Sequence, residues 1–380
     1  MNAGTRWAIS LAATLALSGC ISSSTARHLE AGKGRSQMTV KRDNEKVWID
    51  GVKGFDSGHY ASSPHGCQAT ILSALGETLT YDDLVCYSAF AFRVGVHKEM
   101  CPSAGHPCCG YMCIGRSNDA LLWRVKSFSY KPGEDRAVFE ATACAAIRDS
   151  IDRGVPVHYG VEEDGLIVGY ADEGRRWLCL HPYHKEGKET FWHDEAKGFA
   201  GGKWPWSISV WIEPKPVEER LDHRETVLAA LQQAVDMWQT EKRGDYYCGD
   251  AAYTHWLAWL RGVDAGTVEK PKDGMQGNGW GYDVLLHSRT IANRWLRSQA
   301  DSFDGEARKQ LLSAADHYHE LAEGLIADLK CPWDLALPPH RFGDWTPAIR
   351  QDQIRRLEAA REHDRAAIAA IRKALAGLGG

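Results

Sequence analysis

The residue best suited to covalent chemistry in this sequence is Cys67. It follows His65 and Gly66 and stands directly before a predicted helical run from Gln68 to Leu75. Free backbone amides and the helix dipole at such a position lower the pKa of a thiol and favour the thiolate. Cys67 is therefore a candidate nucleophile. A buried thiol at a helix start, or one half of a disulfide, fits the same position, and these alternatives stay open.

Histidines that could serve as the base lie in the strand-like segments farther along the chain. His158, His181 and His184 are the candidates, and Asp164 or Asp172 could orient the imidazole. His158 lies within a predicted strand, where a hydrogen-bonded sheet residue is the simpler interpretation. His181 ends a strand, and strand ends face the mouths of sites. We therefore expect an acid–base pair formed by one of these histidines and an aspartate.

Four of the eleven cysteines lie close together, at Cys101, Cys108, Cys109 and Cys113, with His97 and His106 nearby. Two disulfides that hold a loop are one interpretation. A zinc or other soft-metal site is another, although paired C-x-x-C knuckles are missing, and a redox or pocket-lining role is a third. Outside this cluster, Cys248 is a rival reactive thiol at the start of a predicted helix.

The N-terminus carries a short basic segment, an apolar run from Trp7, and Leu17-Ser-Gly-Cys20. This pattern resembles a bacterial lipoprotein signal with its lipobox, and the run is too short for a membrane span. The resemblance implies removal of residues 1–19 and lipidation of Cys20. The protein is then expected in the bacterial cell envelope, tethered to a membrane by lipid, where an oxidising environment makes disulfides plausible.

The composition is that of a globular protein. The chain has 380 residues, 44% of them hydrophobic, which suggests two domains with real cores. The formal net charge is −5, with acidic and basic residues interspersed. Because no basic stripe is present, we expect no nucleic-acid partner.

The chain divides into four predicted parts. Residues 1–19 are the signal peptide, 20–45 a flexible tether, 46–214 an α+β domain and 217–380 an all-α helical bundle. Helices come first in the α+β domain and a small antiparallel sheet follows, and prolines at 214 and 216 mark the boundary. The predicted helices are 68–75, 80–94, 119–125, 136–151, 221–242, 250–260, 282–300, 306–329 and 346–375. The predicted strands are 47–49, 155–161, 166–170, 177–180 and 208–212.

A cysteine on a helix followed by a β-sheet resembles the papain-like superfamily. More narrowly, the sequence resembles the bacteriocin-type double-glycine peptidases and the butirosin-biosynthesis acyltransferase family with its N-terminal cysteine domain. The likeness rests on three segments, which are Gly66-Cys67-Gln-Ala-Thr-Ile-Leu-Ser-Ala-Leu, Gly154-Val-Pro-Val, and Gly165-Leu-Ile-Val-Gly-Tyr-Ala-Asp172 with Leu178-Cys-Leu-His-Pro182. It implies a papain-like α+β fold and thiol acyl chemistry.

The sequence departs from that pattern at the catalytic positions. In those peptidases a histidine starts the strand that ends in Gly-Tyr-Asp, whereas Glu163-Asp164-Gly165 stand here. An aspartate precedes the later proline there, and His181 does so here. Either an acid and a histidine pair in exchanged positions, or the catalytic set has been lost. The usual upstream glutamine is also missing, so that Gln68 and the amide of Cys67 would have to hold the oxyanion.

The sequence therefore predicts a membrane-tethered lipoprotein with cysteine-dependent acyl chemistry, either amide or thioester hydrolysis or acyl transfer. A small molecule or peptide would bind in a cleft between the two domains. The alternative is a catalytically degenerate papain-like fold that acts as a ligand-binding or scaffold lipoprotein. A metal-dependent protein with zinc or another soft metal at the Cys101–Cys113 cluster is a third hypothesis, and the first two imply no cofactor.

Overall fold

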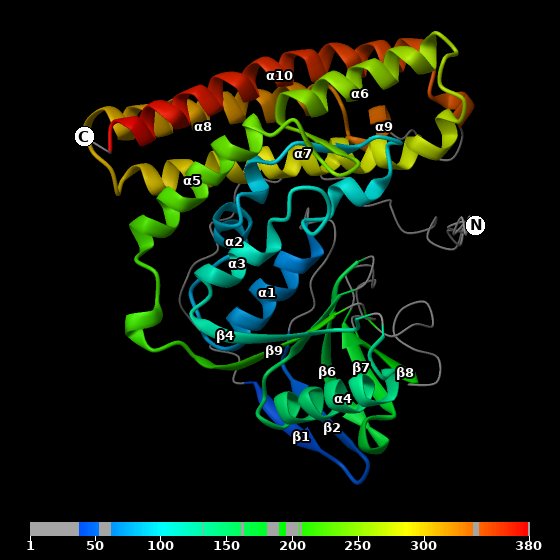
Figure 1. The fold of residues 1–380 in the computed structure, drawn as a ribbon, viewed down its shortest axis with the longest axis vertical. Coiled ribbons are helices and arrows are strands. Elements are labelled where there is room, and N and C mark those ends of the chain that lie inside the picture. Colours follow the sequence, from blue (N-terminus) through cyan, green and yellow to red (C-terminus); the bar gives the residue numbers. More distant parts are fainter. Residues whose placement is uncertain are drawn as a thin grey trace.

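The structure, a computed structural model, describes residues 38–52, 62–131, 133–160, 163–180, 190–194, 205, 207–336 and 342–378. It combines helices with antiparallel strands and has a helical C-terminal region, as the sequence predicts (Figure 1). The predicted signal peptide, Cys20, the tether as far as residue 37, His181 and His184 lie outside the described residues.

Ten α-helices and eleven strands occur in the described chain. The helices are α1 (Ser63–Ala74), α2 (Tyr81–Tyr87), α3 (Ile114–Ala120), α4 (Arg136–Asp152), α5 (His223–Gln239), α6 (Gly249–Asp264), α7 (Pro271–Ala300), α8 (Gly305–Ile326), α9 (Trp333–Ala336) and α10 (Pro347–Ala376). The strands are β1 (Thr39–Arg42), β2 (Lys46–Asp50), β3 (Gly95–His97), β4 (Trp123–Ser129), β5 (Val157–Gly160), β6 (Gly165–Ala171), β7 (Arg176–Leu180), β8 (Thr190–Asp194), β9 (Ser207–Pro214), β10 (Lys242–Arg243) and β11 (Tyr246–Cys248).

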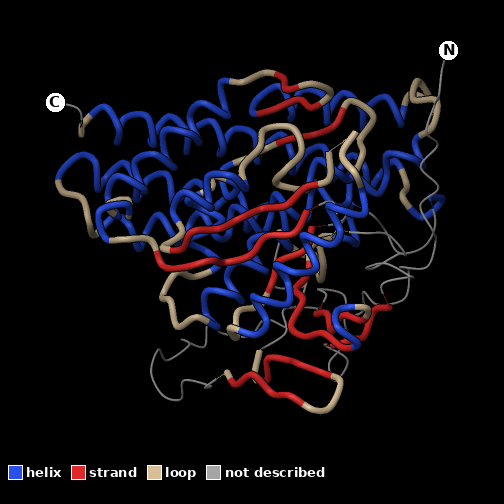
Figure 2. The backbone as a smooth tube through the Cα atoms, turned by 60° about the horizontal axis from the view of Figure 1, so that its bottom comes forward, coloured by secondary structure: helices blue, strands red, loops and turns tan. Residues whose placement is uncertain are grey.

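The strands form two separate sheets (Figure 2). The larger sheet has the order β1-β2-β6-β5-β9-β4, while β7 pairs with β6 and β8 with β7. All of these pairs are antiparallel. The smaller sheet has the order β10-β11-β3, so that it joins a segment before α3 to the hairpin between α5 and α6. Strand β6 is the centre of the larger sheet because it pairs with β2, β5 and β7.

The two faces of the larger sheet are covered by different helices. One face packs on α4, and its buried residues include Ala143, Ile147, Val157, Tyr159 and Ile167. The other face packs on α1, and its buried residues include Cys67, Ile71, Leu72, Leu166 and Val168. Successive side chains of a strand point to opposite faces. His158, between Val157 and Tyr159, therefore points to the face of the sheet on which α1 and Cys67 pack.

Helix α1 starts earlier than the sequence predicts. Ser62 is its N-cap, Ser63 and Pro64 open the first turn, and the amide of Gly66 already donates to the carbonyl of Ser62 at 3.0 Å. Proline suits this turn because its φ is preset and its missing N–H needs no partner there. Cys67 thus lies in the second turn of α1 and not directly before the helix. The expectation that it faces free helix-start amides is therefore wrong.

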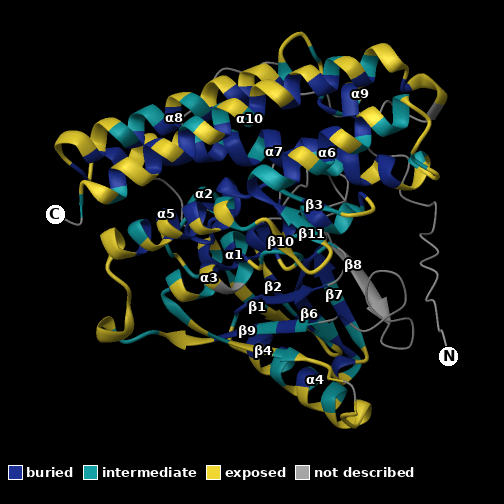
Figure 3. Ribbon diagram, turned by 45° about the horizontal axis from the view of Figure 1, so that its top comes forward, coloured by how far each residue is buried: buried dark blue, intermediate teal, exposed yellow. Residues whose placement is uncertain are grey.

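The helical region packs on a segment from the α+β part of the chain. One apolar cluster contains residues of α5, α6, α7, α8 and α10 and also reaches into residues 85–113. Phe92 packs its ring against Trp295 of α7 and Tyr318 of α8, with ring centroids 6.1 and 5.9 Å apart. The outer faces of α8 and α10 are exposed (Figure 3). The predicted boundary lies between β9 and α5, but apolar packing crosses it.

Helix α7 begins at Pro271, whereas the sequence predicts a helix only from 282. The glycines of the additional turns serve packing. A Cβ atom built on Gly277 would lie 1.8 Å from the carbonyl oxygen of Met100, and one on Gly274 would lie 2.7 Å from the ring of Trp259. Because no side chain stands at these positions, the segment that leads from Met100 into the 3-10 turn Pro102–Gly105 lies directly on the helix.

A buried ion pair joins two helices of the bundle to the segment after α2. Arg289 of α7 and Asp364 of α10 are both fully buried, and Arg289 Nε donates to Asp364 Oδ1 at 2.7 Å. Nη1 of Arg289 also donates to the carbonyl oxygens of Ala91 and Arg93, at 2.6 and 3.3 Å. The same guanidinium therefore fixes the backbone from which Arg93 extends.

Among the described residues, none of the helices combines the length and the apolar character needed to cross a bilayer.

Candidate functional site

Two histidines meet at one buried carboxylate, that of Asp164. Nε2 of His158 lies 2.6 Å from Asp164 Oδ2. Nε2 of His106 lies 3.6 Å from Asp164 Oδ1, an ion-pair distance rather than a hydrogen-bond distance. Asp164 is 4% exposed and His158 is 8% exposed. The carboxylate therefore contacts one imidazole through each oxygen. The described residues contain this His158–Asp164–His106 group, which we call the Asp164 centre.

The start of β6 positions the carboxylate. Ser63, the first residue of α1, receives a hydrogen bond from the amide of Asp164 at 3.0 Å and donates to Glu163 Oε2 at 2.7 Å. Gly165 lies directly against Tyr159, since a Cβ atom there would come within 2.4 Å of its ring. The turn before β6 is therefore fixed by α1 on one side and by β5 on the other.

The charges at the Asp164 centre are set by its own members. Burial by itself raises the pKa of Asp164, but His158 and His106 outweigh it and bring that pKa down to about 2. Burial likewise lowers the pKa of His106, but Asp164, Cys108 and Cys109 outweigh it, so that the pKa of His106 lies well above its ordinary value. The members of the centre therefore favour the ionised form of Asp164 and the protonated form of His106.

His106 belongs to a loop that Arg93 holds in shape. The buried guanidinium of Arg93 donates to four backbone carbonyls, those of Ala104 (2.6 Å), Cys109 (2.8 Å), His106 (3.1 Å) and Tyr111 (3.2 Å). The amide of Cys108 lies 3.2 Å from His106 Nδ1 and donates to it when the imidazole is neutral. The loop that carries the clustered cysteines is therefore wrapped around the guanidinium of Arg93.

Cys109 lies beside His106 and is half-buried. The interaction with His106 lowers the pKa of Cys109 and outweighs its burial, and Tyr246 and Arg93 act in the same direction. The hydroxyl of Tyr246 lies 3.0 Å from Ser103 Oγ. A thiol that is partly exposed and lies near a histidine, an arginine and a tyrosine hydroxyl has the character of a reactive cysteine.

Cys67 has the opposite surroundings. Its side chain is fully buried in the apolar cluster between α1 and the sheet. Burial raises the pKa of Cys67 well above its ordinary value, and the charges of Asp164 and Glu163 raise it further. The structure thus brings Cys67, His158 and Asp164 to one side of the sheet, as the sequence suggests. It leaves Cys67 as a neutral thiol rather than the expected thiolate.

Two other predicted site residues take different roles. Gln68 Nε2 donates to Asn118 Oδ1 at 2.7 Å, and its Oε1 accepts from Ser117 Oγ at 2.9 Å. Both ends of this amide are therefore bound to α3, and Gln68 offers no donor to an oxyanion. Asp172 follows the last residue of β6, whereas Asp164 precedes the first. A seven-residue strand spans about 20 Å, so Asp172 does not orient a base at the Asp164 centre.

His65 is a member of the site that the sequence does not single out. It is fully buried, its Nδ1 lies 2.6 Å from Ser62 Oγ, and its Nε2 has no hydrogen-bond partner in the described part of the chain. Burial lowers the pKa of His65 to about 3, assisted by the charges of His106, Arg93 and His158. The sequence shows that His65 lies near Cys67 in the chain, but it does not show that His106 and Arg93 lie near His65 in space.

The four clustered cysteines form no disulfide bond in the structure. Cys101, Cys108, Cys109 and Cys113 are not bonded to one another. Cys101 Sγ accepts from Ser103 Oγ at 3.1 Å, and buried Cys113 Sγ donates to the carbonyl of Tyr111 at 3.3 Å. Within the described ranges, three or more His, Cys, Asp or Glu side chains nowhere gather in an arrangement that would hold a metal ion. The disulfides stay a prediction, and the metal hypothesis gains no geometric support.

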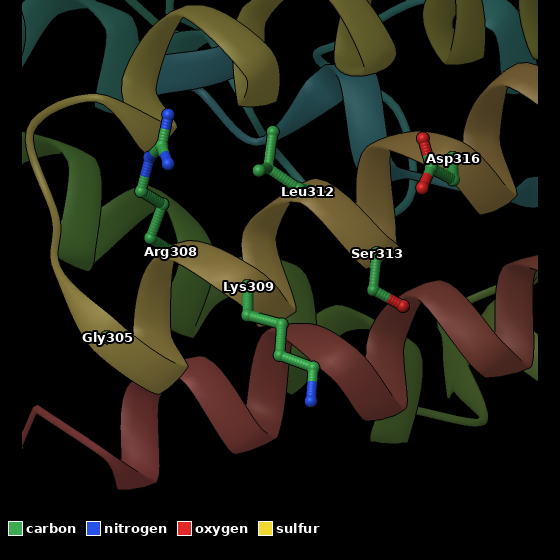
Figure 4. Close-up of a pocket in the computed structure, with 6 residues that line it drawn as sticks. All are labelled: Gly305, Arg308, Lys309, Leu312, Ser313 and Asp316. Atoms are coloured by element: carbon green, nitrogen blue, oxygen red, sulfur yellow. The ribbon is translucent and has the colours of Figure 1, made fainter.

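Two hollows of the surface lie away from these residues. A shallow groove of about 450 Å³ on α8 is lined by Gly305, Arg308, Lys309, Leu312, Ser313 and Asp316 (Figure 4). A second hollow of about 10 Å³ lies between the Arg93 loop and α7, and is no larger than the space that one water needs. Neither is lined by Cys109, His158 or Asp164. The ligand cleft between the two predicted domains therefore stays a prediction.

Comparison with known proteins does not place this chain. No family model matches its sequence, and no curated protein is similar to it.

Proposed function

We propose that this protein carries out thiol-dependent acyl chemistry, the hydrolysis or transfer of an amide or thioester, at the Asp164 centre. One observation carries the proposal, namely an ionised, buried carboxylate that contacts two imidazoles, one of which lies beside a thiol of lowered pKa. Acyl transfer needs a nucleophile, a base beside it and an acid that orients the base, and here a thiol, an imidazole and a carboxylate are the candidates.

Each group has a role that follows from its contacts. His106 is the acid–base residue, because its Nε2 lies 3.6 Å from the carboxylate and its carbonyl accepts a 3.1 Å hydrogen bond from the amide of Cys109. Asp164 stabilises the imidazolium of His106, and His158 holds the second oxygen of Asp164 in place. The 3.6 Å separation of His106 and Asp164 is of the kind that shortens when a substrate fills the site.

A papain-like relationship is part of this proposal. It is supported by Cys67 on a helix that packs on an antiparallel sheet, with His158 on the same face of that sheet. The acid stands at the start of β6, where the family has its histidine, and a histidine stands on the neighbouring strand β5. The acid therefore stands at the family's histidine position, and its imidazole partner comes from β5 instead of from the position of His181.

A second function is favoured by the state of Cys67. This thiol occupies the position of the family's nucleophile but is fully buried with a raised pKa. If no other thiol has taken over, the protein is a ligand-binding or scaffold lipoprotein on a degenerate papain-like fold. In both cases we propose tethering to a membrane of the cell envelope through a lipid on Cys20, which rests on the N-terminal sequence alone.

The test is a rate measurement on the full chain in detergent. Cleavage of p-nitrophenyl acetate and of a short acyl thioester is followed for the wild type and for Asp164→Asn. Loss of the orienting carboxylate is expected to lower the rate about 100-fold or more, as for other acid–base systems. Asp172→Asn, at the far end of β6, is the matched control and should retain the wild-type rate. Equal rates in all three proteins would contradict the proposal.

A further inference from the structure

We infer that the nucleophile of this site is Cys109, with His106 as its acid–base partner and Asp164 as the positioning residue, while Cys67 is a packing residue. The inference rests on the proposed function and assigns its reacting atom. It places the nucleophile on the arginine-wrapped loop 101–113 and not on the helix that carries it in papain-like enzymes.

The orientation of His106 supports this assignment. The Cys108 amide donates to Nδ1, so a neutral His106 carries its proton on Nε2, which faces Asp164 Oδ1. A carboxylate on that side stabilises the imidazolium that forms when the ring takes a second proton. Asp164 therefore acts on the reaction through His106.

Access separates the two thiols. Cys67 is 0% exposed and lies in a cluster with Ile71, Leu72 and Leu166. Cys109 is half-buried, and its neighbour Cys108 is exposed. A carbonyl carbon can approach Cys109 from solvent, whereas reaching Cys67 requires α1 to separate from the sheet.

The surroundings of Cys109 stabilise a negative charge on sulfur. His106, Tyr246 and Arg93 all lower the pKa of this thiol. Arg93 is fixed by its four carbonyl contacts, and Tyr246 by the pairing of β11 with β3, where it lies opposite His97. Because these groups are held by the fold, they need no rearrangement when the thiolate forms.

The reaction balances with these groups and water. The Cys109 thiolate forms a bond to the carbonyl carbon, the bond to the amine or thiol leaving group breaks, and His106 gives that group its proton. Water then attacks the thioester as His106 takes one of its protons. The carbon–sulfur bond breaks, which releases the acid and restores the thiolate beside the imidazolium. In acyl transfer an amine or thiol takes the place of water.

The test compares neighbouring thiols in the full chain. Iodoacetamide alkylation at about pH 6, where an ordinary thiol is well under 1% thiolate, is followed by peptide mapping. In the wild type, Cys109 is expected to react at least about tenfold faster than exposed Cys108. In Cys108→Ser, Cys109 should keep its wild-type rate. His106→Asn should remove this advantage while the far-ultraviolet circular dichroism stays unchanged. Alkylation of Cys109 no faster than that of Cys108 would overturn the inference.

A second measurement separates this inference from the proposed function. The protein is reacted with p-nitrophenyl acetate, quenched in acid, and mapped for the acetylated residue. Acetyl on Cys109 supports both proposals. Acetyl on Cys67 supports the acyl chemistry and overturns the choice of Cys109. Fast alkylation of Cys109 without acetylation of any cysteine overturns the proposed function and, with it, the acyl role of Cys109.

Discussion

The carboxylate of Asp164 accepts a 2.6 Å hydrogen bond from Nε2 of His158, and the two residues come from the start of β6 and from its neighbour β5. In the register of this pair, His158 lies opposite Leu166, two positions after Asp164. The adjacent strands therefore supply an acid and a base on the face covered by α1. This pair anchors the site, because His106 reaches the same carboxylate from a different part of the chain.

The first prediction concerns the stability of the protein in acid. The pKa of Asp164 is depressed from 3.8 to about 2, so its stabilising contribution is present above pH 3.8 and is lost as the pH falls toward 2. By linkage this amounts to about 2 kcal/mol of unfolding free energy. Urea unfolding between about pH 5 and 2 should show this additional loss in the wild type and not in Asp164→Asn. Parallel curves for the two proteins would contradict it.

The second prediction concerns His65, whose pKa is depressed from 6.5 to about 3. A buried neutral histidine stabilises the fold fully above pH 6.5, and that stabilisation is lost as the pH falls toward 3. The loss has an upper limit of about 5 kcal/mol. His65→Gln should show a shallower dependence of unfolding free energy on pH over this range. Replacement of exposed His319 by glutamine is the control, and a His65→Gln curve that follows the wild type would count against this account.

The third prediction tests the arginine that shapes the loop. Arg93→Lys keeps the charge but cannot donate to four carbonyls at once. Amide exchange in residues 101–113 should accelerate, and alkylation of Cys109 should slow to the rate of Cys108. The helical circular dichroism should be retained. Unchanged exchange and alkylation would show that the loop does not depend on Arg93.

The fourth prediction contrasts a buried and an exposed ion pair on α7. Asp364→Asn leaves the buried guanidinium of Arg289 without its counter-charge and should cost about 3–5 kcal/mol of unfolding free energy. Asp82→Asn removes the partner of Arg294, an exposed pair, and should cost about 1 kcal/mol or less. Urea titrations of both variants provide the measurement. Similar losses in the two would contradict the structural role of Asp364.

The fifth prediction concerns the membrane tether. Cys20→Ala removes the proposed site of lipidation, and the protein should then leave the membrane fraction. Cys331→Ala is the control and should stay membrane-bound. An unchanged distribution of Cys20→Ala between membrane and soluble fractions would overturn the tether.

Local signals in the sequence predict much of the fold. Thr80 caps α2 with Asp83 as its reciprocal partner, as the spacing of the two residues indicates. The strand at 166–170 and the helix at 136–151 are found as β6 and α4. The helix expected over 119–125 is wrong, because α3 ends at Ala120 and Trp123 begins β4, which pairs with β9. Pairing with a distant strand determines that segment, and a short window of sequence does not contain it.

The site is predictable in part for the same reason. Cys67, His158 and Asp164 are named from strand and helix patterns, and the structure places them on one side of the sheet. The role of His106 depends on a loop that Arg93 folds back toward β6. Because this contact joins residues that are distant in sequence, no local spacing indicates it. The cysteine spacing that suggests disulfides or zinc belongs to that same loop.

The measurement that tests the central claim most directly is the intact mass of the full chain after brief reaction with p-nitrophenyl acetate and an acid quench. Thiol-dependent acyl chemistry at the Asp164 centre predicts one acetyl group per chain in the wild type and in Asp172→Asn. In Asp164→Asn, acetylation should fall to the background level. Absence of acetylation in the wild type, or equal acetylation in all three proteins, would contradict the account and leave a binding protein on this fold.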